Sequence, residues 1–143
     1  MIKKLTINDV DYIEQIFNLE KEIFKNSAFN KTYLDSLIKA DNSFIYAYII
    51  ENKVCGYLMV LDSIDVYEIL AIATVKEYRN KGIAQELLDK IKTKDISLEV
   101  RESNQIAINF YKKNNFKEIS IRKNYYSEPN ENAIIMKLEV NNE

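Results

Sequence analysis

The chain has 143 residues, of which 47% are hydrophobic and 29% charged, and this composition predicts a single globular domain spanning residues 1–143 with a substantial core. Its formal net charge of −2 argues against a general nucleic-acid-binding protein, and its longest apolar run, at 44–50, is too short to cross a bilayer. The absence of histidine and the single cysteine exclude Ser-His-Asp and Cys-His catalysis and an internal disulfide, and they argue against a bound metal such as zinc.

The first part of the chain reads as a short strand and two helices. Residues 2–7 alternate weakly, as in a strand, and the early polar residues argue against a secretory signal, so we expect a soluble cytoplasmic protein with no membrane partner. Asn8 or Asp9 can cap a first helix, whose inward face we assign to Val10, Ile13, Phe17, Ile23 and Phe24. After a break at 26–30, a second short helix points inward with Leu34, Leu37 and Ile38.

Three strand-like runs follow, at 43–50, 54–61 and 66–75, with polar turns at 51–53 and 62–65 between them. The second run contains Cys55, which we interpret as a packed strand residue rather than a nucleophile. The third run is the long central strand. From Ile69 onward it is continuously apolar, as expected of a strand that is buried on both faces.

The central strand leads into a charged loop at 76–81, then into Gly82 and an amphipathic helix at 83–92. The apolar residues on one side of this helix are Ile83, Leu87, Leu88 and Ile91. Such a loop is a natural anion site, because free N–H groups and the positive end of the helix dipole face it. Its spacing matches neither a P-loop nor a dinucleotide-binding fingerprint, and a simple turn glycine is the alternative.

The remaining elements are a strand at 96–101, a helix at 104–114 and strands at 116–123 and 132–140. The loop between the last two strands contains the single proline, Pro129. The complete order is strand, two helices, three strands, helix, strand, helix and two strands. This order favours an α/β fold in which helices cover a mixed sheet.

The loop sequence Arg79-Asn80-Lys81-Gly82-Ile83-Ala84 resembles the Arg/Gln-x-x-Gly-x-Gly/Ala pyrophosphate loop of the GNAT N-acetyltransferases, although many relatives have glycine at the position of Ala84. The resemblance implies the GNAT acyl-CoA N-acyltransferase fold, a central mixed β-sheet flanked by helices, with acetyl-CoA as cosubstrate and no metal. The same resemblance implies cofactor contacts along the central strand, the loop and the next helix, at Ile72, Ala73, Thr74, Arg79, Asn80, Lys81, Gly82, Ile83, Ala84, Gln85, Asn104 and Tyr111.

The strand at 96–101 and the helix after it carry a second pattern. Strand alternation separates an apolar face from a polar face that consists of Ser97, Glu99 and Arg101. Helical spacing places Asn104, Ala107, Ile108 and Tyr111 in one stripe, and it places Ile106 and Phe110 in another that suits the core. The residues alone favour a solvated face for Glu99 and Arg101, and Tyr111 can be an amphipathic tyrosine with a packed ring.

As one string, these residues resemble the RimI-type ribosomal-protein N-terminal acetyltransferases, through Leu98-Glu99-Val100-Arg101-x-Ser103-Asn104-x-x-Ala107-Ile108-x-x-Tyr111-x-x-x-x-Phe116. The resemblance implies that Glu99 is the general base, Tyr111 the general acid and Asn104 a cofactor contact. An α-amine, with a pKa near 8, must lose a proton before it attacks a thioester, and the leaving thiolate must gain one. A backbone N–H within 72–74 is expected to stabilise the oxyanion, and the attack is direct, without a covalent enzyme intermediate.

The last strand pair carries a third pattern, in which Ile121-Arg122-Lys123-Asn124-Tyr125-Tyr126 and Asn132-Ala133-Ile134-Ile135-Met136 resemble the same branch, whose usual form has aspartate in place of Asn132. We expect this hairpin and the loop at 27–30 to receive the acceptor, through Phe29, Tyr125 and Tyr126. A hairpin with aromatic residues on its shoulder is the structural alternative.

Two other positions depart from the usual pattern of this branch. Asn115 replaces a usual glycine but tolerates left-handed geometry. The segment from 84 to 99 is short, so the helix that begins at 83 must end early, near Lys92 or Thr93.

The resemblance therefore implies an acetyl-CoA-dependent N-alpha-acetyltransferase whose partner is a protein N-terminus, that of the eighteenth small-subunit ribosomal protein. Two alternatives stay open: a GNAT enzyme that acetylates a small amine, polyamine or lysine side chain, and a non-catalytic acyl-CoA-binding or partner-binding module. The presence of both Glu99 and Tyr111 favours an enzyme over the module. No motif indicates a nucleic-acid partner, and the sequence predicts no oligomeric state.

Overall fold

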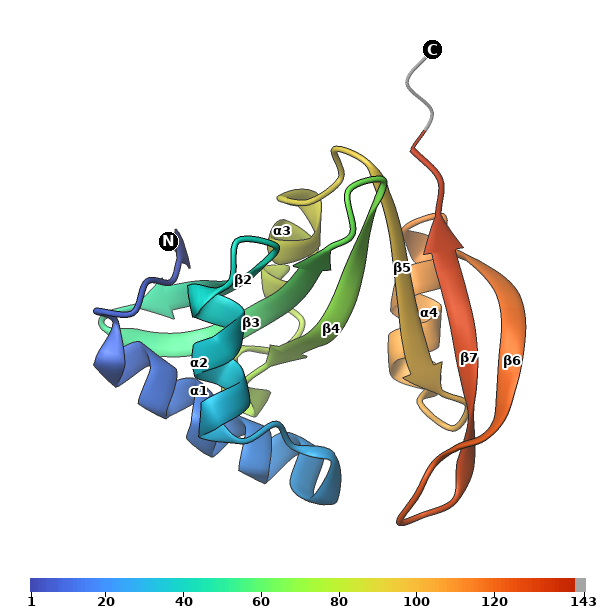
Figure 1. Ribbon diagram of the computed structural model, residues 1–143, viewed down its shortest axis with the longest axis horizontal. Coiled ribbons are helices and arrows are strands. Elements are labelled where there is room, and N and C mark those ends of the chain that lie inside the picture. Colours follow the sequence, from blue (N-terminus) through green and yellow to red (C-terminus); the bar gives the residue numbers. More distant parts are fainter. Residues whose placement is uncertain (141–143) are drawn as a thin grey trace.

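The computed structural model describes residues 1–140, which fold around a seven-stranded sheet (Figure 1). Its elements in chain order are β1 (Ile2–Lys4), α1 (Val10–Phe24), the 3-10 turn η1 (Lys25–Ser27), α2 (Lys31–Lys39), β2 (Ser43–Ile50), β3 (Lys53–Asp62), β4 (Val66–Thr74), the 3-10 turn η2 (Lys76–Tyr78), α3 (Ile83–Asp89), β5 (Asp95–Arg101), α4 (Gln105–Lys113), β6 (Lys117–Tyr126) and β7 (Glu131–Leu138). The predicted element order is therefore confirmed, with shifts of a few residues at the ends.

The sheet is mixed, as predicted, and its strands follow the order β1-β2-β3-β4-β5-β7-β6. All neighbouring strands are antiparallel except β4 and β5, which are parallel. The β4–β5 pairing covers only residues 66–69 and 95–98, and beyond these residues the two strands diverge, as Figure 1 shows. The second half of β4 thus has a neighbour on one side only, which leaves backbone groups on its other edge free for a ligand.

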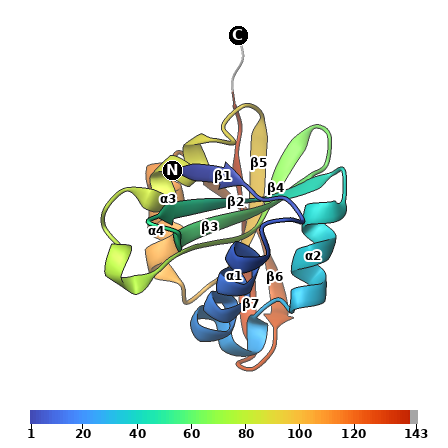
Figure 2. The ribbon, with the colours of Figure 1, turned by 90° about the vertical axis from the view of Figure 1, so that its left-hand side faces the viewer.

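Two layers of helices cover the sheet: α1 and α2 lie on one face, and α3 and α4 lie on the other (Figures 1 and 2). Alternation along β2 divides its side chains between two apolar cores, one beneath each pair of helices. The buried residues of β5, which are Ile96, Leu98 and Val100, all belong to the core beneath α3 and α4, and its other face is polar. Helix α3 packs so closely on β3 that a Cβ at Gly56 would lie 2.7 Å from Ile83 Cγ2 and 3.0 Å from the Ala73 carbonyl oxygen. A residue without a side chain is required at this contact.

Several local predictions are confirmed. Leu34 and Leu37 are buried beneath α2, and Cys55 is fully buried in β3. In addition, Asn104 is the N-cap of α4, where its Oδ1 accepts a hydrogen bond from the Ala107 N–H at 3.2 Å. Asn115 has φ 72°, the left-handed conformation expected after this helix.

Other predictions are wrong, for identifiable reasons. Val10 is 63% exposed because it opens α1 at the molecular edge, and Ile106 is 87% exposed because α4 turns the stripe containing Ile108 and Tyr111 toward the core instead. Helix α3 ends at Asp89 and not near Lys92 or Thr93. Strand β4 is not buried on both faces: most of its residues are half-buried, because the strand borders the gap that opens beside it.

Within residues 1–140, no helix combines the length and the apolar character that a membrane crossing requires.

Candidate functional site

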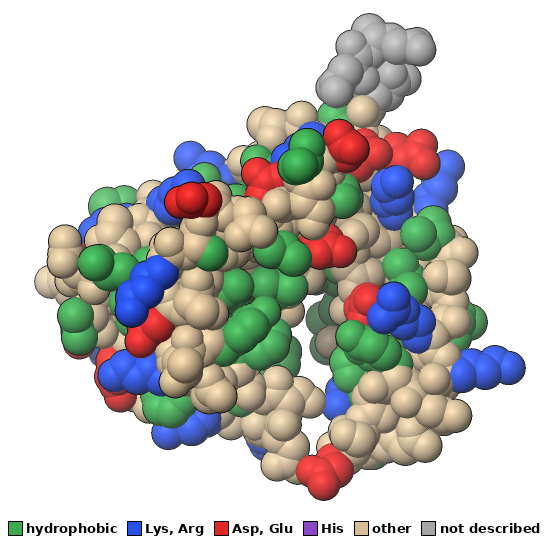
Figure 3. Space-filling model, viewed as in Figure 1, with side chains coloured by type: hydrophobic (Ala, Val, Ile, Leu, Met, Phe, Trp, Pro, Cys, Tyr) green, Lys and Arg blue, Asp and Glu red, His purple; other side chains and the backbone are tan. Residues whose placement is uncertain are grey.

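A cleft with a volume of about 740 Å³ lies where β4 and β5 diverge. Figure 3 shows it as a hollow between the half of the molecule that carries α1 and α2 and the half that carries β5, β6 and β7. Its walls come from α1, η1, α2, β4, β5, α4 and the β6–β7 hairpin. Because the sheet is split at this point, the cleft is lined by residues from both faces of the sheet.

A second hollow, of about 590 Å³, lies at the opposite end of the β6–β7 hairpin, and its lining includes Asp95, Lys117 and Lys137. Among the residues described, none of those predicted for the site lines this hollow. The cleft beside β4 instead brings together Glu99, Tyr111 and the acceptor-side aromatic residues, so the candidate site is there.

Glu99 lies on the polar face of β5 and retains 30% of its side-chain exposure. Its Oε1 is 3.3 Å from a terminal nitrogen of Arg122, and the guanidinium of Arg122 lies over the Tyr125 ring at 5.3 Å. Hydrogen bonding between Tyr125 and Glu99 raises the pKa of that tyrosine. The predicted base is therefore a partly solvated carboxylate held between one cation and one phenol at the cleft surface.

Tyr111 reaches the same cleft from the other face of the sheet, on α4. Only 4% of the residue is exposed, and its ring packs against Phe110 and Phe116 with centroid distances of 5.5 and 5.3 Å. Burial, followed by the neighbouring Tyr126, raises the pKa of Tyr111 well above that of a free phenol. The hydroxyl therefore remains protonated at neutral pH, which is the form that a proton donor needs.

Ile72 and Asn104 also line the cleft, as predicted for cofactor contacts. The other predicted cofactor residues are not among the described residues that line it; they continue from the end of β4 through the following loop into α3. These residues are Ala73, Thr74, Arg79, Asn80, Lys81, Gly82, Ile83, Ala84 and Gln85.

The loop that follows β4 contains two residues in the left-handed conformation, and some of its side chains have contacts within the protein. Asn80 and Gly82 have positive φ values of 63° and 81°, which fold the loop back at the start of α3. Arg79 Nε donates to the Thr74 carbonyl at 3.2 Å, and Gln85 donates to Asp89 and Asn114. Ile83 is only 3% exposed, so it can offer a ligand little more than its backbone N–H.

Acetyl-CoA fits this arrangement. The edge of β4 that lacks a neighbour can pair with the amides of an extended pantetheine chain, and the loop with Lys81 suits phosphates. The described residues contain no group of three or more cysteine, aspartate or glutamate side chains placed to hold a metal ion.

The predicted acceptor side is lined by Phe29, Tyr125 and Tyr126, which come from the loop before α2 and from the β6–β7 hairpin. The Phe29 N–H donates to Glu20 Oε1 at 3.0 Å, and the Tyr57 hydroxyl donates to Glu20 Oε2 at 2.5 Å. Glu20 is 1% exposed, and burial raises its pKa, although both hydrogen bonds act in the opposite direction. A buried carboxylate thus fixes the backbone that carries Phe29.

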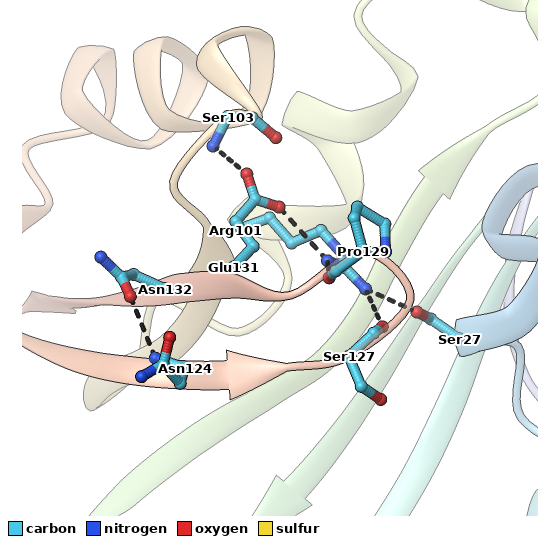
Figure 4. Close-up of polar contacts among 8 residues, drawn as sticks. All are labelled: Ser27, Arg101, Ser103, Asn124, Ser127, Pro129, Glu131 and Asn132. Carbon is cyan, nitrogen blue, oxygen red and sulfur yellow. Dashed lines mark hydrogen bonds and ion pairs between the residues drawn. The ribbon is translucent and has the colours of Figure 1, made fainter.

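Four charged residues that line the cleft received no role from the sequence, namely Glu20, Glu68, Arg101 and Arg122. Arg101 and Glu131 lie where the loop after α1 meets the β6–β7 hairpin (Figure 4). Arg101 belongs to the same polar strand face as Glu99, and this alternation was the available signal. The sequence indicated a role for Glu20 only weakly, through the position of a charged residue beside the apolar face of α1.

Comparisons with known proteins agree with this geometry. The model of the Acetyltransferase (GNAT) family matches residues 10–116. A Bacillus subtilis protein that carries the provisional name of ribosomal protein bS18-alanine N-acetyltransferase is 29% identical, with 98% of this chain and 95% of that protein covered. An N-alpha-acetyltransferase of Saccharolobus solfataricus is 30% identical over 89% of this chain and 87% of its own. The crystal structure of Arabidopsis thaliana NAA60 in complex with acetyl-CoA superposes with a TM-score of 0.83 at 14% identity, covering 98% of both chains.

Proposed function

The chain belongs to the GNAT acetyltransferase family, and we propose that within this family it acetylates the N-terminal amine of a protein with acetyl-CoA as the donor. The observation that carries the proposal is the cleft at the divergence of β4 and β5, which holds Glu99 and Tyr111 between an edge suited to a cofactor and two aromatic walls. The cleft opens to both faces of the sheet. A donor can therefore approach from the α3–α4 side and an acceptor from the α1–α2 side.

Acetyl-CoA supplies the activated acetyl group, and the chain's own residues position it. The backbone of Ile72, Ala73 and Thr74 would pair with the pantetheine arm and provide the N–H that stabilises the oxyanion. Residues 79–85 would hold the pyrophosphate through backbone N–H groups and Lys81, and Asn104 would contact the arm from the start of α4.

Glu99 would take the proton from the acceptor amine, directly or through a water molecule. Arg122 and Tyr125 hold the carboxylate in place while the site is empty of acceptor, and an incoming ammonium group offers it an alternative charged partner. Tyr111 would return a proton to the leaving thiolate. Its raised pKa makes full ionisation unfavourable, so the transfer is expected to coincide with cleavage of the thioester carbon–sulfur bond.

For the acceptor we propose a protein N-terminus, and in particular that of ribosomal protein bS18. The name of the Bacillus subtilis relative supports this choice, and so does the RimI-like string from Leu98 to Phe116. Ribosomal proteins and acetyl-CoA are both present in the cytoplasm, where we place the reaction. The equally similar archaeal relative is named only for N-alpha-acetylation, so a broader range of N-termini is the second candidate.

The experiment that tests this acceptor is acetylation of a peptide panel, followed by mass spectrometry that locates the added acetyl group. The panel contains the bS18 N-terminal sequence, the same sequence with a changed first residue, and unrelated N-termini that contain lysine. Preferential modification of the bS18 α-amine is the expected result. Equal modification of all α-amines would support the broader N-terminal activity, and modification of lysine side chains would contradict the proposal.

A further inference from the structure

A polar network crosses one end of the cleft, where η1 meets the β6–β7 hairpin (Figure 4). At its centre is Arg101, the last residue of β5. One terminal nitrogen of Arg101 donates to Ser27 Oγ at 3.0 Å and to the Ser127 carbonyl at 3.4 Å. The other donates to the Pro129 carbonyl at 3.1 Å and to Glu131 Oε1 at 3.2 Å. A single guanidinium thus joins two loops that are far apart in the sequence.

The network also contacts the acceptor side of the cleft, through Tyr126, and the start of α4 on the predicted cofactor side, through Ser103. The Arg101 guanidinium lies 4.3 Å from the centroid of the Tyr126 ring, which lines the acceptor side. The second carboxylate oxygen of Glu131 accepts from the Ser103 N–H at 2.8 Å, one residue before the N-cap of α4. The hydrogen bonds from Ser103 and Arg101 lower the pKa of Glu131, so this carboxylate is ionised at neutral pH.

We propose that Arg101 is a positioning residue that fixes the two acceptor-binding loops relative to each other and thereby sets the affinity for the acceptor peptide. This inference rests on the proposed function, because it assigns the acceptor to the space between these loops. The residue does not take part in the chemistry. Its role is to hold the Ser27 loop and the hairpin at the separation that an extended N-terminus fills.

The hydrogen-bond inventory of Arg101 supports positioning over direct substrate binding. Its four terminal N–H groups match the four acceptors found, so a substrate could use them only by releasing a loop. The side chain is 22% exposed and that of Glu131 is 15% exposed, so the pair is shielded more than the Arg122–Glu99 pair. Ordered loops bind a peptide more tightly because the entropy of ordering them is lost before the peptide arrives.

The test compares Arg101→Gln, Arg101→Lys and Ser27→Ala with Lys123→Gln, a matched control that removes one charge from an exposed site on β6. Each variant is examined by hydrogen exchange of the segments 24–30 and 124–132 without ligand, by steady-state kinetics with a free-amine peptide, and by calorimetric titration with acetyl-CoA. Exchange measured without ligand reports on the loops whether or not the acceptor has been identified.

We expect Arg101→Gln to speed exchange in both segments by about threefold or more and to raise the peptide KM by roughly tenfold. The kcat at saturating peptide and the Kd for acetyl-CoA should stay within about twofold of wild type. Ser27→Ala should affect segment 24–30 alone, Arg101→Lys should recover part of the peptide affinity, and Lys123→Gln should match wild type. If Arg101→Gln does not fold, Arg101→Lys and Ser27→Ala give the same two readouts.

Unchanged exchange in both segments would overturn the inference, and so would a lower kcat at an unchanged KM, which would indicate a chemical role. Equal effects of Lys123→Gln would overturn it as well, because the loss of any positive charge would then explain the changes seen with Arg101→Gln. If the wild-type protein acetylates no peptide amine, the proposed function fails, and with it the role in peptide affinity. The exchange data would then still show whether Arg101 joins the two loops.

Discussion

Replacing Glu99 by Gln gives a quantitative test of the proposed base. The substitution keeps the size of the side chain and removes its charge at a position that is 30% exposed, so little loss of stability is expected. Arg122 loses its ion pair at 3.3 Å but is itself 55% exposed and can be solvated. The variant should therefore fold and bind acetyl-CoA as the wild-type protein does.

The size of the kinetic effect follows from the acceptor amine. With a pKa near 8, only about one tenth of an α-amine is neutral at pH 7, whereas about nine tenths is neutral at pH 9. Without a base the enzyme must use this neutral fraction, so we expect kcat/KM of Glu99→Gln to fall at least about tenfold at pH 7. The deficit relative to wild type should shrink several-fold by pH 9.

The assay is continuous detection of the released CoA thiol between pH 6.5 and 9. Arg122→Gln is the informative comparison, because it removes the same ion pair and keeps the carboxylate. This comparison variant should show no selective recovery at high pH. A Glu99→Gln enzyme with the wild-type rate at pH 7 would refute the role of Glu99 as base, and so would a deficit that is the same at pH 7 and pH 9.

Two further predictions concern the proposed pyrophosphate loop at 79–85 and the buried carboxylate of Glu20. Lys81→Ala should weaken acetyl-CoA binding by roughly fivefold, about 1 kcal/mol, in a calorimetric titration, with Lys117→Ala unchanged; equal affinities of the two variants would leave only backbone contacts to the phosphates. Burial raises the pKa of Glu20, so its stabilising contribution is complete below the ordinary carboxyl value and is lost as the pH rises through the folded-state pKa. Glu20→Gln removes the titrating group and keeps one acceptor oxygen, so its Tm relative to that of wild type should be higher at pH 7.5 than at pH 4.5. The same Tm difference at both pH values would contradict this account of Glu20.

The fold could be predicted because its strands and helices alternate with clear periods. The period of two in β5 placed Ile96, Leu98 and Val100 in the core and Glu99 on the opposite face, as the structure shows. Helix α4 was harder, because both of its stripes contain apolar residues. Only the packing of the helix on the sheet decides that Ile106 faces outward, and this packing depends on β5 and β7.

The candidate site could be predicted in part, because a sequence motif can identify only residues that lie close together in the chain. Glu99 and Tyr111 lie close in the sequence, and the cleft contains both. The contacts of Arg101 with Ser27 and Glu131 connect residues that are 74 and 30 positions apart. No local pattern encodes such a contact, so it becomes visible only when the strand order is known.

The most direct test of the central claim is thiol release from acetyl-CoA in the presence of a peptide with the bS18 N-terminus, measured beside the same peptide with a blocked amine and beside a panel of small amines. We predict release with the free-amine peptide and none with the blocked peptide or the small amines. Release with small amines alone would keep the fold and the chemistry but contradict the protein acceptor. Binding of acetyl-CoA without release under any condition would contradict N-terminal acetylation of the peptides tested and favour a binding module.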